Sequence, residues 1–336
     1  MNTQQTLLEA LMERGVSRRS FLKFAGVTAS ALALSSQQAR VFADALANVR
    51  RPTVIWLSFQ QCTGCSESIL RSFDPSIETL VLDVISLDYH ETLQVAAGEF
   101  AEKARKDAMA AAYGQYVLIV DGAIPTGESE FWSCAAGNSN LATLNEAVSG
   151  AALVVALGTC AAYGGIPAAY PNPTHAAGYA DLVAQGLVRP SGEGRLPPFV
   201  NIAGCPPMAS VITGTIAYYL VHGIPQLDAY FRPVVFYGQT VHDSCPRLSH
   251  FIAGNFANSY GDEGARQGYC LIGLGCKGPE TFNACTALGW NRDPSTNEPK
   301  YSPTLVGHGC IGCSEPQFWD KGFDPITKTF RSSFYY

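Results

Sequence analysis

The placement of four cysteines behind strand-like segments constrains the fold more than any other feature of this chain. Cys62 and Cys65 follow the apolar segment 54–59, Cys160 follows 152–157, and Cys205 follows 199–203. Short apolar, β-branched runs of this kind are typical of strands buried on both faces of a parallel sheet. The carboxyl ends of such strands share one edge, where open α/β sheets bind their ligands. The sequence therefore predicts four thiols gathered at one sheet edge.

Other segments fit the same α/β pattern. Further strands are predicted at 80–86, 116–121 and 234–237. Helices are predicted at 93–113, which is rich in alanine, and at 206–222, which begins with prolines and ends before a glycine. Strands that alternate with helices indicate an α/β fold, here a flavodoxin-like doubly wound parallel sheet.

The N-terminus has the pattern of an export signal. Arg18 and Arg19 lie in Ser-Arg-Arg-Ser-Phe-Leu-Lys, an apolar stretch follows at 24–34, and small residues recur at 41–47. The apolar stretch is too short to span a bilayer, which takes about 20 residues. These features predict a twin-arginine signal and delivery to the periplasm. The alternative is a surface helix that happens to carry adjacent arginines.

Regular periodicity fades after residue 239, while Gly, Pro, aromatic residues and Cys accumulate. A region with little secondary-structure signal needs other stabilising links, and bound metals supply them. We therefore expect a signal peptide at 1–45, a flavodoxin-like domain at 46–238 and a C-terminal domain at 239–336. Residues 44–52 are expected to form a linker. The C-terminal domain is expected to be largely irregular and to bind iron–sulfur clusters. No segment of the chain is expected to anchor it in a membrane.

Composition narrows the classes of function. Charged residues make up 15% of the chain, against roughly 25% in an average soluble domain, so we expect a large buried interface with a partner. The formal net charge of −6 gives no electrostatic footprint for nucleic acid. The 11 cysteines are odd in number, which excludes a complete intramolecular disulfide framework and favours metal binding.

The cysteines fall into three sets of candidate ligands. Four thiols at one edge, Cys62, Cys65, Cys160 and Cys205, fit a four-iron cubane, with a four-cysteine zinc site as the alternative. The second set is His242, Cys245, Cys270 and Cys276. A lone histidine is usually structural, although this one precedes a cysteine by three residues. The third set, Cys285, Cys310 and Cys313, fits a three-iron cluster or an incomplete four-ligand site. Cys134 is left over and is expected to be a buried free thiol.

Five motifs carry a resemblance to a known family. They are Cys-Thr-Gly-Cys-Ser-Glu at 62–67, Gly-Ala-Ile-Pro at 122–125, Gly-Thr-Cys at 158–160, Gly-Cys-Pro-Pro at 204–207 and Gly-His-Gly-Cys-Ile-Gly-Cys-Ser-Glu-Pro at 307–316. In this order they resemble the nickel–iron hydrogenase small subunit over residues 52–320. The resemblance implies one-electron relay during H2 ⇌ 2 H⁺ + 2 e⁻. The bond cleavage itself belongs to a separate large subunit with a nickel–iron centre, so no catalytic residue is expected in this chain.

The resemblance also implies how the ligand sets are used. The first set would bind the proximal [4Fe-4S] cluster, the second the distal [4Fe-4S] cluster and the third the medial [3Fe-4S] cluster. Pro303 would replace a fourth thiolate at the medial cluster. The expected partners are the large subunit and a cytochrome or another membrane or periplasmic electron acceptor.

Two departures from related sequences bear on mechanism. Gly64 and Gly165 stand where some oxygen-tolerant relatives carry two extra cysteines, which predicts an ordinary proximal cubane. Gln61 stands where many relatives have glutamate, which argues against proton handling at this position. Two alternatives remain open: an electron-transfer subunit of another complex I-related oxidoreductase, and a zinc-stabilised binding protein with no redox role.

Overall fold

The computed structural model describes residues 6–13, 15–72, 85–190, 195–292 and 299–320, together with two short strands at 323–324 and 329–330. At its centre lies a five-stranded parallel sheet in the order β2-β1-β3-β6-β7. Its strands are β1 (Thr53–Ser58), β2 (Ser86–His90), β3 (Tyr116–Asp121), β6 (Ala151–Leu157) and β7 (Phe199–Ile202). When these five strands are numbered 1 to 5 in chain order, their order across the sheet is 2-1-3-4-5. This is the flavodoxin-like order and confirms the predicted fold class.

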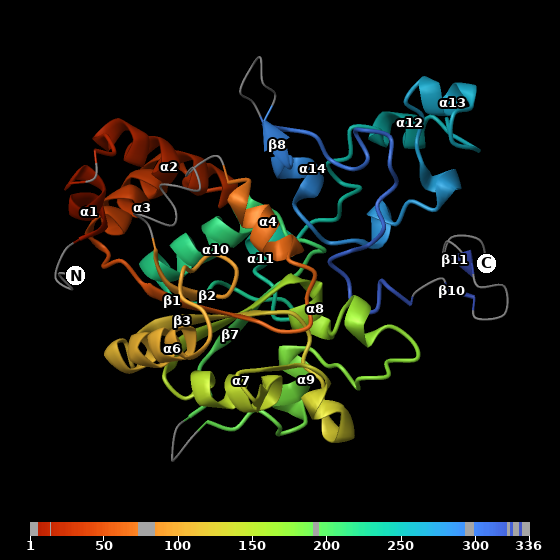
Figure 1. The fold of residues 1–336 in the computed structure, drawn as a ribbon. Helices are drawn as coiled ribbons and strands as arrows, with labels where there is room; N and C mark the ends of the chain where they lie inside the picture. Colours follow the sequence, from red (N-terminus) through yellow and green to blue (C-terminus); the bar gives the residue numbers. More distant parts are fainter. Residues whose placement is uncertain are drawn as a thin grey trace.

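Helices cover both faces of this sheet (Figure 1). One face packs against α6 (Glu99–Ala111), α7 (Asn140–Val148) and α9 (Tyr179–Ala184). The other packs against α10 (Ala209–His222) and α4 (Gly64–Leu70). Successive strand residues point to opposite faces, so Leu118 and Val120 join one core while Val117 and Ile119 join the other. This two-sided burial explains why β3 is apolar from end to end up to Asp121.

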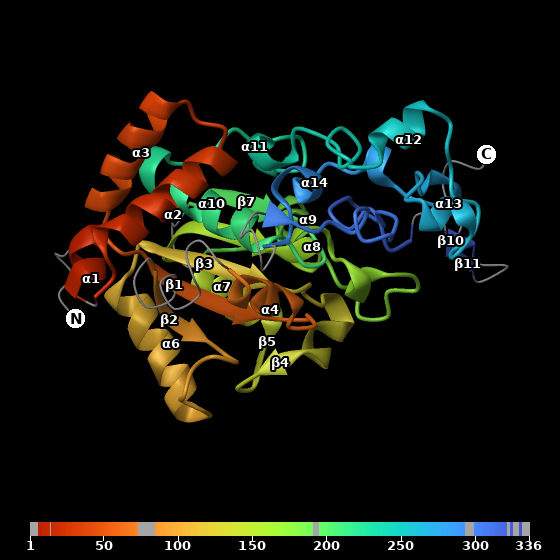
Figure 2. The same ribbon diagram turned by 90° about the horizontal axis from the view of Figure 1, so that it is seen from above.

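The N-terminal segment folds into three helices, α1 (Leu7–Glu13), α2 (Arg18–Ala31) and α3 (Ser36–Asn48). They lie on the α10 side of the sheet, where α2 and α3 contact α10 (Figure 2). Phe24 of α2 is 3% exposed, and Phe42 of α3 is fully buried against the His222 ring. The predicted linker at 44–52 is therefore wrong, because α3 continues to Asn48 and Leu46 is buried. None of the described helices is long and apolar enough to cross a membrane.

The predicted strand at 234–237 is also wrong. These residues form the short helix α11 (Val234–Tyr237), which follows Pro233 and ends at Gly238. A short apolar run does not distinguish a strand from a buried helical turn. The predicted strand at 80–86 lies mostly outside the described residues, and β2 begins only at its last residue.

The C-terminal region is built from short elements, as the sequence predicts. Its helices are α12 (Leu248–Ile252), α13 (Glu263–Arg266), α14 (Cys285–Leu288) and the 3-10 turns η4 (Ile272–Leu274) and η5 (Gly278–Glu280). Its strands are β8 (Asn291–Arg292), β9 (Pro299–Lys300), β10 (Phe323–Asp324) and β11 (Thr329–Phe330). The region lies beside the carboxyl ends of the central strands (Figures 1 and 2).

Candidate metal centres

Four thiols meet at the carboxyl edge of the sheet. Cys62 and Cys65 stand at the start of α4, Cys160 lies in α8 (Gly158–Tyr163), and Cys205 follows β7. Burial, together with the nearby Cys205 and Cys62 thiols, raises the pKa of the Cys160 thiol to about 12. The Cys65 thiol has a raised pKa from burial, from Asp121 and from the other thiols. Such thiols stay protonated on their own, so a cationic iron centre is what would hold them as thiolates.

Three glycines leave the space around these sulfurs open. A Cβ at Gly158 would lie 2.5 Å from the Cys65 sulfur, and one at Gly165 would lie 2.6 Å from the Cys160 sulfur. At Gly64 the corresponding distance to the Cys62 sulfur is 3.2 Å. Gly158 and Gly165 also have φ values of +83° and +56°, which favour glycine. The backbone here is shaped to leave room at the thiols.

A buried carboxyl lies directly behind this edge. Asp121 is the last residue of β3 and is 1% exposed, and burial raises its pKa to about 7. Its Oδ2 accepts a hydrogen bond of 3.3 Å from the Trp56 indole, and its side chain also contacts Cys65. Asp121 thus helps to set the polarity around the Cys65 sulfur. The sequence alone marks it only by its position at the end of a strand.

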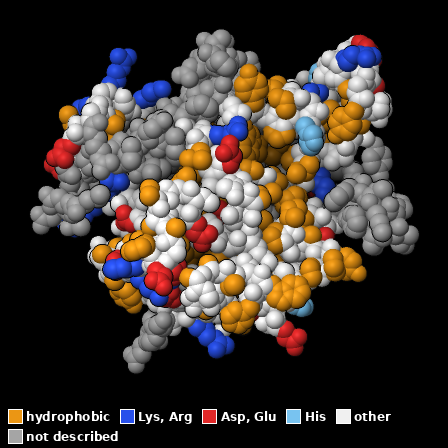
Figure 3. Space-filling view, in the orientation of Figure 1, with side chains coloured by type: hydrophobic (Ala, Val, Ile, Leu, Met, Phe, Trp, Pro, Cys, Tyr) orange, Lys and Arg blue, Asp and Glu red, His pale blue; other side chains and the backbone are white. Residues whose placement is uncertain are grey.

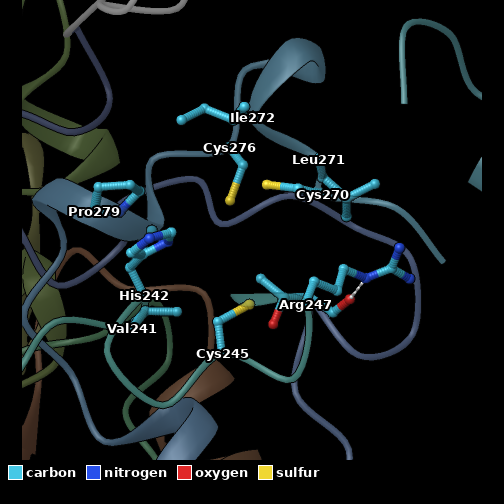
Figure 4. Close-up of a pocket in the computed structure, with 11 residues that line it drawn as sticks. Val241, His242, Cys245, Arg247, Cys270, Leu271, Ile272, Cys276 and Pro279 are labelled. Atoms are coloured by element: carbon cyan, nitrogen blue, oxygen red, sulfur yellow. Dashed lines mark hydrogen bonds between the residues drawn. The ribbon is translucent and has the colours of Figure 1, made fainter. Parts of the chain in front are cut away.

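The second set of predicted ligands lines one pocket in the C-terminal region. His242, Cys245, Cys270 and Cys276 point toward a common space in Figure 4. The His242 ring packs edge-on against Phe251, with 4.6 Å between ring centroids, which fixes the direction of the imidazole. A charged side chain that lines the pocket, Arg247, was not anticipated from the sequence. Its guanidinium donates to the backbone carbonyls of Thr304 and Tyr269.

The third set lines a cavity of about 150 Å³ between the other two sites. Its thiols come from Cys285, Cys310 and Cys313, and Pro303 also lines the cavity. Burial raises the pKa of Cys285 to about 12 and also raises the pKa of Cys313. Trp290 and His308 also line the cavity, and the Trp290 indole N–H, which belongs to no sequence motif considered above, faces the Cys285 thiol and offsets part of the rise in its pKa.

The three sites lie in series. Cys205, a thiol of the sheet edge, also lines the cavity of the third set. Val241 and Thr304 line both that cavity and the pocket of the second set. The third site therefore shares lining residues with the site at the sheet edge and with the second site, and lies between them.

The remaining cysteine differs from expectation. Cys134 is exposed, not buried, because it lies in a small hairpin of β4 (Cys134–Ala135) and β5 (Asn138–Ser139) that projects from the body. The preceding Phe131 and Trp132 are each 67% exposed. Hydrophobic side chains also gather over the right-hand half of the face in Figure 3, where the loops after the strands and the C-terminal region lie. A thiol in such a patch is buried only if another protein covers it.

Comparison with known proteins divides the chain in two. A family model described as "NADH ubiquinone oxidoreductase, 20 Kd subunit" matches residues 62–219, and a model of the C-terminal part of the NiFe/NiFeSe hydrogenase small subunit matches residues 237–325. The periplasmic [NiFe] hydrogenase small subunit 1 of Nitratidesulfovibrio vulgaris is 46% identical over 314 residues, which are 93% of this chain and 94% of that relative. The chain belongs to the nickel–iron hydrogenase small-subunit family. The C-terminal match decides between this family and the complex I-related alternative.

Two further comparisons agree with this membership. The uptake hydrogenase small subunit of Afipia carboxidovorans is 42% identical, over 96% of this chain and 83% of its own length. The solved structure of the Ni-Fe-Se hydrogenase from Desulfomicrobium baculatum matches with a TM-score of 0.70 and 31% identity, over 83% of this chain and 98% of that one. Membership in a cysteine-rich hydrogenase small-subunit family implies bound iron–sulfur clusters and a large subunit as partner.

Proposed function

We propose that this chain is the electron-transfer subunit of an exported, uptake-type nickel–iron hydrogenase. The observation that carries the proposal is the serial arrangement of three cysteine-rich sites with shared walls. Hydrogen oxidation, H2 → 2 H⁺ + 2 e⁻, would take place in the large subunit. The present chain would bind the clusters that accept its electrons and hold them in line toward an external acceptor.

The ligand sets follow the three sites. The proximal [4Fe-4S] cluster is assigned to Cys62, Cys65, Cys160 and Cys205. The medial [3Fe-4S] cluster is assigned to Cys285, Cys310 and Cys313, and the distal [4Fe-4S] cluster to His242, Cys245, Cys270 and Cys276. Bound there, the clusters would supply one-electron transfer at potentials set by ligand type, hydrogen bonds and burial.

The chemistry of the donor sets favours clusters over zinc. In the part of the chain that the structure describes, no three His, Cys, Asp or Glu side chains are grouped so that they could hold a single metal ion. Thiols that converge on a common space without closing on one point fit a larger inorganic group. At the medial site, Pro303 offers no thiolate, which favours a three-iron cluster over a cubane.

The large subunit is expected to cover the sheet edge that carries the proximal thiols. Cys62 and Cys205 are exposed there. Ile166 and Tyr170, on the loop that follows Cys160, are 56% and 78% exposed. Ser129, just before the Phe131-Trp132 pair, donates a hydrogen bond to the Pro173 carbonyl and so holds these two apolar loops side by side. An exposed apolar patch of this kind marks a protein interface.

Gly64 and Gly165 lie against the Cys62 and Cys160 sulfurs, so these two positions beside the proposed proximal ligands carry no cysteine. We therefore expect an ordinary proximal cubane with a single redox step. The twin-arginine pattern at the N-terminus supports delivery to the periplasm. A cytochrome or another membrane or periplasmic carrier is the expected acceptor at the distal site.

The experiment is affinity purification of the tagged chain from its native host under anaerobic conditions. A nickel-containing protein should co-purify, and the complex should reduce a dye with H2 as the electron donor. Cys205→Ser should lower iron content and dye reduction, whereas Cys134→Ser, which alters a thiol outside all three sites, should leave both unchanged. A colourless, zinc-containing protein, or an iron protein that never associates with nickel, contradicts the proposal.

A further inference from the structure

Thr159 connects ligand-bearing segments of two different sites. It lies in α8 directly before Cys160 and is 1% exposed. Its backbone N–H donates to the Gly204 carbonyl at 2.9 Å, and its hydroxyl oxygen accepts from the Gly204 N–H, also at 2.9 Å. The same hydroxyl donates to the Cys313 carbonyl. A hydroxyl has one proton to donate, so these partners fix the orientation of its O–H bond.

These bonds hold Cys205 against Cys313. Gly204 directly precedes Cys205, whose backbone N–H faces the Cys313 sulfur and offsets part of the pKa rise that burial causes in that thiol. A backbone group of a proposed proximal ligand thus contacts the sulfur of a proposed medial ligand. The next pair of sites is joined in the same way, since the Cys310 N–H donates to the Cys276 sulfur at 3.2 Å.

We propose that Thr159 is a positioning residue for electron transfer between the proximal and medial sites, because its hydroxyl bridges the Gly204 N–H, next to Cys205, and the Cys313 carbonyl. The inference rests on the proposed function. With clusters bound at the two sites, each step would transfer one electron from a reduced proximal cluster to an oxidised medial cluster. No bond forms or breaks, and no proton moves. An N–H···S bond also stabilises the more negative, reduced state of the cluster that it contacts, which raises the medial potential.

The test compares Thr159→Val, which keeps the shape but removes the hydroxyl, with Thr159→Ser, which restores it. Thr215→Val is the matched control, because Thr215 is equally buried but its hydroxyl bonds only within α10, to the Val211 carbonyl. Each variant is purified as the complete complex of large and small subunits. Iron content is measured, and the proximal and medial potentials are titrated by electron paramagnetic resonance.

We expect Thr159→Val to keep its iron while the equilibrium for electron transfer from the proximal to the medial cluster falls by about tenfold, a shift of about 59 mV for one electron. Thr159→Ser and Thr215→Val should stay within twofold of the unaltered protein. Unchanged potentials in Thr159→Val overturn the inference while leaving the proposed function intact. A complex without three cluster signals even before substitution overturns the proposed function itself.

If Thr159→Val loses its medial cluster, the contact between the Cys205 N–H and the medial cluster is measured in the unaltered protein and in Thr159→Ser. Exchange into D2O should remove a strongly coupled proton from the medial cluster's electron–nuclear double resonance spectrum in both. The absence of any exchangeable coupled proton there overturns the inference.

Discussion

Replacing Arg232 by methionine should destabilise the link between the two halves of the protein. The Arg232 side chain is 2% exposed and donates to Asp228 at 2.8 Å, to Glu315 at 2.9 Å and to the Ser314 carbonyl at 3.0 Å. Ser314 and Glu315 directly follow Cys313, a proposed medial ligand, whereas Asp228 belongs to the loop beside β7. The guanidinium therefore ties the medial site to the sheet domain.

The size of the effect follows from burial. Glu315 is 10% exposed, and without Arg232 it keeps only the hydrogen bond from the Phe282 N–H. Removing one partner of a buried ion pair costs about 3–5 kcal/mol, because the other charge is left desolvated. Neutralising that charge in an Arg232→Met/Glu315→Gln double variant should recover about 1–3 kcal/mol. Methionine keeps the apolar part of the packing against Tyr230 and Tyr237.

The assay is urea denaturation of the cluster-loaded protein, followed by tryptophan fluorescence and by the visible absorbance of the clusters. Arg266→Met is the control, because its pair with Glu263 is exposed at both ends and is worth about 0–1 kcal/mol. Equal losses for Arg232→Met and Arg266→Met would refute the reasoning. So would a double variant no more stable than Arg232→Met alone.

Three further changes have defined outcomes. Gly158→Ala should reduce iron content by about four atoms per chain, since its Cβ would lie 2.5 Å from the Cys65 sulfur, whereas Gly186→Ala, also at a positive φ but with open space around it, should retain all its iron. Burial lowers the pKa of His90 to about 4 in the folded state, whereas the pKa of this side chain is about 6.5 in the unfolded state. As the pH falls, the unfolded state therefore takes up the proton first. Stability should fall by about 3 kcal/mol as the pH drops from 6.5 to 4, and His90→Gln should flatten the pH dependence of the urea midpoint in that window; a parallel profile would contradict this. Phe24→Ala in the full-length chain should speed protease cleavage within residues 15–48, because Phe24 is 3% exposed and its loss leaves a cavity. Leu22→Ala, at a position that is 50% exposed, should not change the cleavage rate. Equal cleavage rates for the two variants would show that α2 is not docked on α10.

The sequence predicted the features that depend on local pattern. The run at 116–121 is buried along its whole length, so its limits as β3 follow from composition alone. The thiols after the strands meet at one edge because parallel strands all end there. The grouping of the later cysteines could be proposed only from the family resemblance that the motifs carry.

Features that depend on long-range packing were missed. The residues at 234–237 form a helix and do not extend the sheet. The loop that contains Phe231 lies along β7 instead, since the Asn201 N–H donates to the Phe231 carbonyl. Thr159 could not be singled out, because its hydroxyl partner Cys313 lies 154 residues away. Cys134 was expected inside because free thiols are commonly buried, but the hairpin that carries it projects from the body.

The central claim is that one chain holds three separate iron–sulfur centres in a row. The most direct measurement is iron and acid-labile sulfide analysis of the anaerobically purified complex, combined with a stepwise reductive titration followed by electron paramagnetic resonance. After the iron of the large subunit is subtracted, we predict about 11 irons in the small subunit. We also predict one signal in the oxidised protein, from the three-iron centre, and two that develop on reduction. About four irons with a single reducible signal would contradict the account, because only the site at the sheet edge would then be occupied.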